Sequence, residues 1–451
     1  MPKYSAVTNT EIKDDSLPVN FFKDASTKGE IEFISDPTKE SISKLIAGTD
    51  IHYQADLLNT IWKLLVVDAI SFLKGKDTRE KYHDHMTLGT DELYSFLKEF
   101  QRFEPMLYGS VPHYRDHIAH VLRVYLLGQY VIKTSIGFEN ISFSKDELVT
   151  PSEKEAMWCI IALTHDLGIS LEKVHIINQS VRSMLQKFGN IPVQEIGHSY
   201  FAQFGPISEY VVKFLSSDVA KTSRGEGFAT HVQSKYYQKF LAALGDFNHG
   251  VMSSIILMKD LVYFKEADYT LDQTKLLDDD DARQFMIRRE ILRAIAAHSC
   301  DDIYYLGVKN FPFLLTMFDE MQEWGRPRLV DIFKRGESST KLTINKLDGR
   351  TVDYRVTFYF KEGPKPSKDE RKNAKIEIIR YCLSKRNKWL NVLRSAVGGD
   401  LRNLTLHFEV ENCSYARKKE MYTLKHVTPE DVDIDPENED LEKRLPPSQY
   451  S

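Results

Sequence analysis

The feature that most constrains the fold is a series of ten segments in which apolar residues recur at helical spacing. A period of about 3.6 residues places an apolar stripe along each helix, and such stripes must be buried against one another. The segments lie at residues 51–75, 90–106, 113–135, 152–168, 171–188, 197–217, 233–246, 249–264, 283–298 and 311–323. The pattern predicts a mainly α-helical fold in which residues 51–335 form a helical bundle domain.

A different pattern begins after residue 335. The stretch KLTINKLDGRTVDYRVTFYF alternates on both sides of Asp348-Gly349, a dipeptide typical of a tight β-hairpin. A helix is expected at 368–397, and NLTLHFEVEN has the pattern of another strand. These elements predict a small α+β domain over residues 336–425.

Both ends of the chain are polar. Residues 1–50 show little periodicity and are interpreted as a loosely packed N-terminal arm, while residues 426–451 are acidic and predict a disordered tail. The chain starts without a signal-peptide pattern, and no apolar stretch reaches the roughly 18 residues that a membrane span requires. We therefore expect a cytoplasmic protein that does not bind membranes.

Charge and cysteine content limit the classes of function. The net charge of -5 does not favour a protein that binds nucleic acid through broad neutralisation of phosphates. The four cysteines contain no C-x-x-C pair, which argues against a disulfide framework and against a thiolate zinc site. A metal site in this chain would therefore use imidazole and carboxylate ligands.

The run CIIALTHDLGIS ends an apolar helical pattern with His165 and Asp166 side by side. Burial of a carboxylate without a partner is costly or neutralises the group, and a metal ion would supply the missing partner. Ser152 is expected to cap the start of this helix, with Glu155 completing a capping box, and Gly168 is expected to end it.

Further histidines stand where apolar helical runs begin or end. His117 and His120 are three residues apart and so share a helix face, and His249, His298 and Asp319 lie at other helix ends. A lone histidine on such a face is usually a core residue bonded to a backbone carbonyl. As a set, however, imidazoles and carboxylates from several helices are suited to hold one divalent ion or a pair.

The order of the elements HVLRV, HDLG, HGVMSS, AAHS and MFDE resembles the HD-domain superfamily of metal-dependent phosphohydrolases over roughly residues 113–326. The resemblance implies one or two divalent transition metal ions (Mn, Fe, Ni, Co or Zn). The implied ligands are His120, His165, Asp166 and Asp319, with His249 and His298 added in the two-metal version. The chain lacks the G-Y-P signature of members that hydrolyse cyclic dinucleotides, so that substrate is not assigned.

The resemblance also implies the reaction, which is hydrolysis of a nucleotide or other phosphoester by a metal-activated water. In the two-metal version, Asp166 would bridge the ions. His117 is the first candidate for protonating the leaving oxygen and Asp116 is a weaker one. The alternative role for His117 is to orient His120.

Three cations are candidates for contact with the substrate phosphate: Arg123, Lys173 and Arg326. A structural salt bridge is the alternative for each. The expected partner is therefore a small phosphorylated molecule, while homo-oligomerisation stays open.

Other interpretations use the same residues. His198 or His231 could replace His249 as a ligand, because both lie in the long interval after the HDLG motif. Four histidines with two aspartates also resemble the di-iron oxygenases of the myo-inositol oxygenase type. A third alternative is a non-catalytic HD protein that senses a ligand.

Overall fold

The fold is seen in a computed structural model. It describes residues 4–47, 54–74, 90–110, 117–173, 187, 200–223, 225, 227–261, 276–300, 309–326, 338–360, 403–412, 419–428 and 431–434. The predicted segments 171–188 and 368–397 lie mostly or wholly outside these residues.

The described part of the chain is mainly helical, as predicted. The helices are α1 (Ser16–Thr27), α2 (Asp36–Ser43), α3 (Ala55–Lys74), α5 (Thr90–Ser110), α6 (Ile118–Val131), α7 (Pro151–Thr164), α9 (Tyr200–Leu215), α10 (Ser234–Gly245), α11 (His249–Leu261), α12 (Asp279–Ala297) and α13 (Phe311–Met321). A π-helical turn, Ile132–Ile136, continues α6, and 3-10 turns follow at Phe138–Asn140 and Asp146–Leu148.

Helix α7 has its N-cap two residues earlier in the chain than predicted. Its N-cap is Thr150, whose hydroxyl accepts a hydrogen bond from the Glu153 amide, while the Glu153 carboxylate accepts one from the Thr150 amide. The expected cap at Ser152 with Glu155 is therefore wrong, because Pro151 fits the first helical position, where no amide donor is needed.

The N-terminal segment is part of the fold. Strand β1 (Val7–Ile12) joins the main sheet, and α1 packs against α6 through buried residues that include Val19 and Phe22. The prediction of a loosely packed arm is wrong for this segment. Its apolar residues are too sparse to show periodicity, yet they are enough to cover two faces of the helical core.

The main sheet has six strands in the order β1-β4-β5-β6-β7-β8. Its further strands are β4 (Ser338–Leu347), β5 (Thr351–Phe360), β6 (Asn403–Asn412), β7 (Lys419–Thr428) and β8 (Asp431–Ile434). The predicted hairpin at Asp348-Gly349 is confirmed, since β4 and β5 pair antiparallel on either side of it. The one parallel pair in this sheet is β5 with β6, and its crossover contains the residues of the predicted helix 368–397.

Strand pairing extends past the predicted domain boundary. Strand β7 runs to Thr428 and pairs with β8, so the predicted disordered tail is wrong for the residues from 426 to 434 that the structure describes. A second sheet, also not predicted, is the hairpin of β2 (Ser217–Lys221) and β3 (Phe228–Val232).

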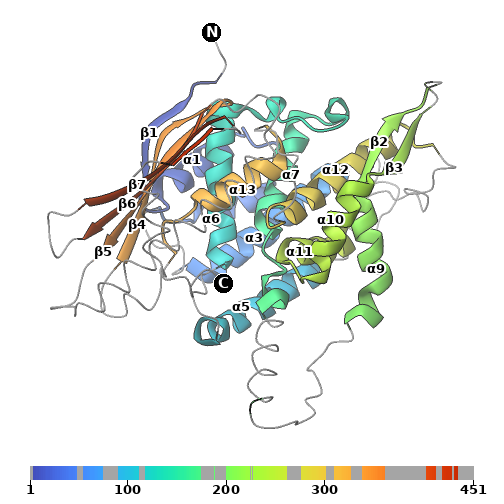
Figure 1. Ribbon diagram of the computed structural model, residues 1–451, viewed down its shortest axis with the longest axis horizontal. Coiled ribbons are helices and arrows are strands. Elements are labelled where there is room, and N and C mark those ends of the chain that lie inside the picture. The colour runs from blue at the N-terminus through green and yellow to red at the C-terminus, as the bar shows by residue number, and fades with distance from the viewer. Residues whose placement is uncertain are drawn as a thin grey trace.

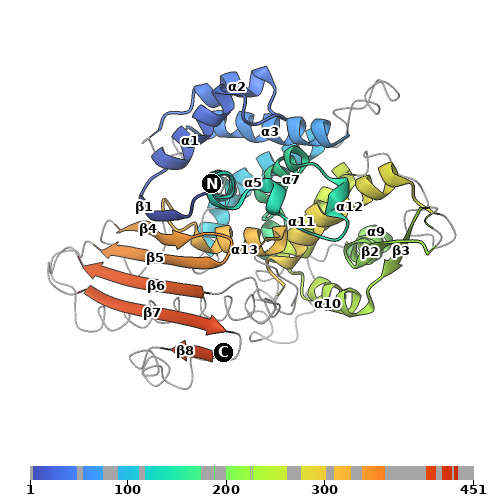
Figure 2. The ribbon, with the colours of Figure 1, turned by 90° about the horizontal axis from the view of Figure 1, so that it is seen from above.

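Sheet and helices share one hydrophobic core. Leu342, Ile344 and Val356 of the sheet belong to the same buried cluster as Trp158 and Phe318 of the helices. Figures 1 and 2 show the main sheet at one end of the molecule and α9, α10 and the β2–β3 hairpin at the other, with α6, α7, α12 and α13 between them. The site described below lies among these central helices.

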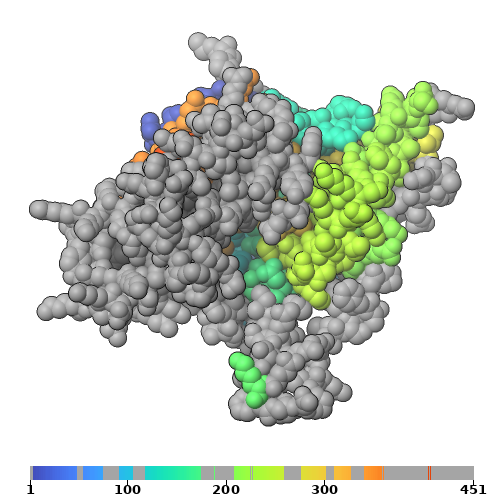
Figure 3. Space-filling model, viewed as in Figure 1, coloured from blue at the N-terminus to red at the C-terminus, as the bar shows by residue number. Residues whose placement is uncertain are grey.

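The space-filling view shows α10 and the β2–β3 hairpin at the surface of one face (Figure 3).

Among the described helices, none is both long and apolar enough by itself to span a membrane. The pair Ser234–Gly245 and His249–Met258, bent by 101°, satisfies those two criteria only when taken together.

Candidate metal centre

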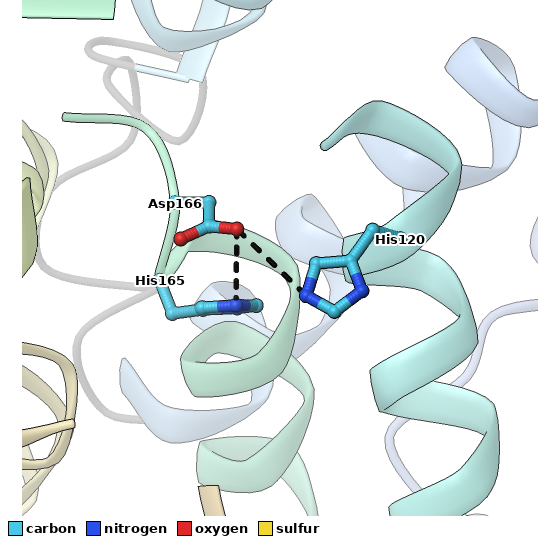
Figure 4. A group of neighbouring side chains, drawn as sticks. All are labelled: His120, His165 and Asp166. Atoms are coloured by element: carbon cyan, nitrogen blue, oxygen red, sulfur yellow. Dashed lines mark ion pairs between the residues drawn. The ribbon is translucent and has the colours of Figure 1, made fainter. Parts of the chain in front are cut away.

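Five helices bring six polar side chains to one point in the core. His120 lies in the first turn of α6, His165 and Asp166 directly follow α7, His249 opens α11, His298 follows α12, and Asp319 lies in the last turn of α13. All six were predicted as metal ligands. Figure 4 shows the His120 and His165 rings facing the Asp166 carboxylate.

One half of the cluster surrounds the Oδ2 atom of Asp166. His165 Nε2 lies 3.4 Å and His120 Nε2 lies 3.8 Å from this oxygen. The Oδ1 atom of Asp319 is 2.9 Å from His120 Nε2 and 4.0 Å from His165 Nε2. Two imidazole nitrogens and two carboxylate oxygens therefore face one another within the core.

The other half of the cluster surrounds the Oδ1 atom of Asp166. The Nε2 atoms of His249 and His298 each lie 3.7 Å from this oxygen and 3.2 Å from each other. His298 is buried, whereas about a fifth of the His249 side chain is exposed. Asp166 is thus shared, with one carboxylate oxygen directed to each half.

Backbone carbonyls orient two of the four imidazoles. His165 Nδ1 lies 2.9 Å from the Ala162 carbonyl oxygen, and His298 Nδ1 lies 2.5 Å from the Ile295 carbonyl oxygen. A carbonyl only accepts, so each Nδ1 carries the proton and each Nε2 of a neutral ring presents a lone pair to the cluster. His165 Nε2 is buried and has no hydrogen-bond partner among the described residues.

Side chains orient the other two imidazoles. His249 Nδ1 lies 2.6 Å from Glu172 Oε2, which also accepts a hydrogen bond from the His249 amide at 3.1 Å. His120 Nδ1 lies 2.5 Å from Gln322 Oε1. All four imidazoles therefore have an acceptor behind them, which is the usual arrangement for metal-binding histidines.

The orientation of the Gln322 amide fixes the tautomer of His120. Gln322 Nε2 donates to the Trp324 carbonyl oxygen at 2.7 Å, so Oε1 is the atom that faces His120 Nδ1. With its proton on Nδ1, a neutral His120 presents a lone pair to the Asp319 carboxylate oxygen 2.9 Å away. Two acceptors at this separation repel each other unless a proton or a metal cation lies between them.

The titration behaviour of the cluster depends on burial and on the shared carboxylate. Burial, together with the positive charge of Arg326, lowers the pKa of His120 to about 4, and burial lowers the pKa of His298 to about 4. Burial alone would raise the pKa of Asp166, but the charge of His165 and the hydrogen bonds from His165 and His298 together hold that pKa well below its ordinary value. Burial alone would lower the pKa of His165, but the Asp166 and Asp319 carboxylates and the Ala162 carbonyl together raise it.

A close backbone crossing places α11 beside the end of α7. A Cβ atom on Gly168 would lie 2.3 Å from the His249 carbonyl oxygen, so glycine is needed for this approach. Ser253 bridges the crossing, since its hydroxyl accepts from the Gly168 amide at 2.7 Å and donates to the His165 carbonyl at 2.6 Å. Gly168 was predicted to end α7, but the helix ends at Thr164 and the glycine instead permits close packing.

His117 lies beside the cluster. Its ring centroid is 6.5 Å from that of His120, and its Nδ1 is 3.7 Å from Glu104 Oε1. The same Glu104 oxygen accepts a hydrogen bond from the His117 amide at 2.9 Å. Asp116, the weaker candidate for proton donation, lies outside the described residues.

The three candidate phosphate contacts are placed differently. Arg123 is buried in a bidentate pair with Asp15, at 2.8 and 3.0 Å, so the structural alternative describes it and the predicted substrate contact is not supported. Lys173 pairs with Oε1 of Glu172 at 2.6 Å, on the same carboxylate whose Oε2 holds His249. Arg326 lies close enough to His120 to lower its pKa.

Of the two alternative ligands, His231 does not join the cluster. His231 is exposed on β3, opposite Asp218 in the β2–β3 hairpin. His198 lies outside the described residues. The described histidine that fills this place is His249.

Sequence reasoning missed the residues that orient the ligands. Glu172 and Gln322 carry no motif of their own, and each acts on a histidine distant in the chain. Their positions offered a weak signal, since Gln322 lies one turn after Asp319 and Glu172 lies shortly after the HDLG motif.

The described residues thus form three overlapping groups that could hold metal: His120, His165 and Asp166; His165, His298 and Asp319; and Asp166, His249 and His298. Comparison with protein-family models, curated proteins and solved structures finds no match to this chain.

Proposed function

We propose that the protein is a metal-dependent phosphohydrolase of the HD type, acting on a nucleotide or another phosphoester. The observation that carries the proposal is the convergence of four imidazole rings and two carboxylates, of which Asp166 is shared by both halves of the cluster. The order of these ligands along the chain supports it, because it resembles the order in the HD-domain superfamily.

The donor atoms are suited to divalent transition metals. Imidazole with carboxylate favours Mn, Fe, Co, Ni or Zn over calcium. Two ligands about 2.1 Å from one ion are about 3.0–3.4 Å apart in octahedral or tetrahedral coordination. The separations of 2.9 Å between His120 and Asp319 and 3.2 Å between His249 and His298 fit this spacing.

The proposed reaction assigns a task to each group at the site. A bound divalent ion would supply an acidified water and would neutralise charge on the phosphate oxygens. His117, backed by the Glu104 carboxylate, would hold a proton for the leaving oxygen. Arg326 would add positive charge on the His120 side, and Lys173 on the His249 side.

The first test is metal content together with release of phosphate or of a nucleotide product. The purified protein is expected to contain one to two ions per chain of Mn, Fe, Ni, Co or Zn, and chelators are expected to stop turnover. The substrates to screen are nucleoside mono- and triphosphates, cyclic mono- and dinucleotides and short oligonucleotides. Full activity in a metal-free preparation would refute the proposal.

The same samples separate the two alternative functions. A di-iron oxygenase would show an iron EPR signal and consume oxygen without releasing phosphate. A ligand-sensing protein would bind metal or nucleotide without turnover of either kind. The phosphohydrolase predicts release of phosphate or of a nucleotide product in the absence of oxygen.

A pair of histidine variants tests whether the half-site at His249 holds an ion. His249→Ala is expected to lower bound metal by about one equivalent and turnover by orders of magnitude, because the second charge beside Asp166 is lost. The control is His231→Ala, since His231 is exposed on β3 and away from the cluster. If both variants keep wild-type metal content and turnover, His249 is not a ligand.

A further inference from the structure

A buried chain of hydrogen bonds leads from the N-terminal segment to His120. Asp15 accepts from Arg123 Nε at 2.8 Å and from Trp324 Nε1 at 2.8 Å. The carbonyl of Trp324 then accepts from Gln322 Nε2, and Gln322 Oε1 faces His120 Nδ1. Asp15 is 4% exposed and Gln322 is fully buried, so solvent does not compete for these bonds.

The same contacts clamp the segment that follows Asp319. Arg123 lies one helical turn after His120 on α6, and its Nη1 donates to the Gly325 carbonyl at 2.8 Å. Gly325 has φ +65°, and a Cβ there would lie 2.6 Å from the Arg123 guanidinium. The turn therefore leaves no room for a side chain at residue 325, where the guanidinium lies, and Arg326 is the next residue.

We propose that Asp15, Arg123, Trp324 and Gln322 form a positioning network that holds His120 in the tautomer and orientation needed to bind metal. The N-terminal segment thereby completes the site. This inference rests on the proposed metal centre. It adds that two residues outside the predicted ligand set, Asp15 and Gln322, set the metal affinity of the His120 half-site.

The network should affect metal binding at His120 more than it affects folding. A hydrogen-bond acceptor behind Nδ1 fixes the orientation of the ring and makes Nε2 a better electron-pair donor to the metal. Loss of that acceptor typically costs 10- to 100-fold in metal affinity. Among the described residues, Gln322 joins His120 to the clamp, because its amide oxygen faces the imidazole and its amide nitrogen faces Trp324. Replacing the amide should therefore change metal binding more than it changes folding.

The test is titration of the metal-free, full-length chain with Co²⁺ alone, followed by visible absorption and by calorimetry. Gln322→Met keeps the volume but removes the acceptor, and it is expected to weaken Co²⁺ binding 10- to 100-fold and to shift the absorption bands. Gln322→Glu keeps an acceptor for His120 Nδ1 but loses the donor to the Trp324 carbonyl, so it is expected to bind Co²⁺ more tightly than Gln322→Met and less tightly than the wild type. A role in packing alone predicts the reverse order, since a buried carboxylate is worse for folding than methionine.

The N-terminal link is tested with neighbouring aspartates. Asp15→Asn weakens the acceptor for Arg123 and is expected to lower Co²⁺ affinity, whereas Asp14→Asn changes an exposed residue whose carboxylate accepts a hydrogen bond from the amide of Ser16. Equal affinity in these two variants would refute the link. If Asp15→Asn does not fold, the Gln322 pair decides the proposal.

The outcomes also separate this inference from the proposed function. A wild-type chain that binds no Co²⁺ would refute the metal centre itself. A wild-type chain that binds Co²⁺ as tightly as Gln322→Met would leave the centre in place and refute the positioning network.

Discussion

Adding one methyl group at Gly168 should separate the two halves of the cluster. The methyl would lie 2.3 Å from the His249 carbonyl oxygen, 2.6 Å from the Ser253 amide nitrogen and 2.7 Å from the Met252 Cβ. An ordinary contact is about 3.5 Å, so the two backbone segments must move apart by roughly 1 Å. No flexible side chain is available to absorb this shift, because two of the three neighbours are backbone atoms.

The expected cost follows from that displacement. Overpacking of a core typically costs about 1–3 kcal/mol in the free energy of unfolding. His249 Nε2 lies 3.7 Å from Asp166 Oδ1, which is already slightly more than the usual separation of two ligands on one ion, and a further 1 Å would prevent both atoms from reaching the same ion. Gly168→Ala should therefore lose stability and also the metal bound at the His249 half.

The matched control is Gly245→Ala. A Cβ on Gly245 would meet nothing within 4 Å, so this substitution should leave stability unchanged or raise it by up to about 1 kcal/mol. Urea unfolding measures the first effect, and elemental analysis measures the second. If Gly168→Ala matches Gly245→Ala in both measurements, the close crossing does not hold α11 in place.

Three further predictions concern charge, capping and pH. Arg123→Met should cost about 3–5 kcal/mol in urea unfolding, because it leaves Asp15 buried without its cation; a loss below 1 kcal/mol would contradict the buried pair. Thr150→Ala should cost about 0.5–2 kcal/mol by removing the capping hydroxyl, measurable in the same assay, and no loss would argue against the cap. Since the pKa values of His120 and His298 are lowered to about 4 from the ordinary 6.5, the unfolded chain binds more protons between these values. The metal-free protein should therefore lose stability as pH falls through this window, by about 1.4 kcal/mol per pH unit for each histidine. Unfolding at several pH values should show a slope about one proton smaller in His298→Gln, and an unchanged slope would contradict the assignment.

Local patterns were sufficient to predict most of the described helices and the β4–β5 hairpin. The helices follow from apolar periodicity, and the hairpin from Asp348-Gly349 between alternating residues. The six candidate ligands stood out because polar, metal-binding residue types occur at the ends of strongly apolar helices. Each of these signals lies within about 20 residues of chain.

Features that depend on distant pairing were not predictable in this way. Gln322 meets His120 across 202 residues, and Trp324 meets Asp15 across 309. Nothing in the local sequence around Asp15 distinguishes it from Asp14, yet one is buried and the other exposed. The integration of the N-terminal segment was missed for the same reason, because its partners all come from elsewhere in the chain.

The pairing of β1 with β4 has a consequence for the chain as it leaves the ribosome. Glu11 on β1 and Lys341 on β4 form an ion pair across 330 residues. At about 5–20 residues per second, synthesis of the intervening chain takes about 17 to 66 s. During that interval β1 lacks the strand it pairs with in the folded protein and Asp15 lacks Trp324, so this segment reaches its final contacts only after residues 324 to 347 have been made. Docking of β1 and Asp15 must therefore follow synthesis of β4, and the waiting segment is a natural place for chaperones to bind.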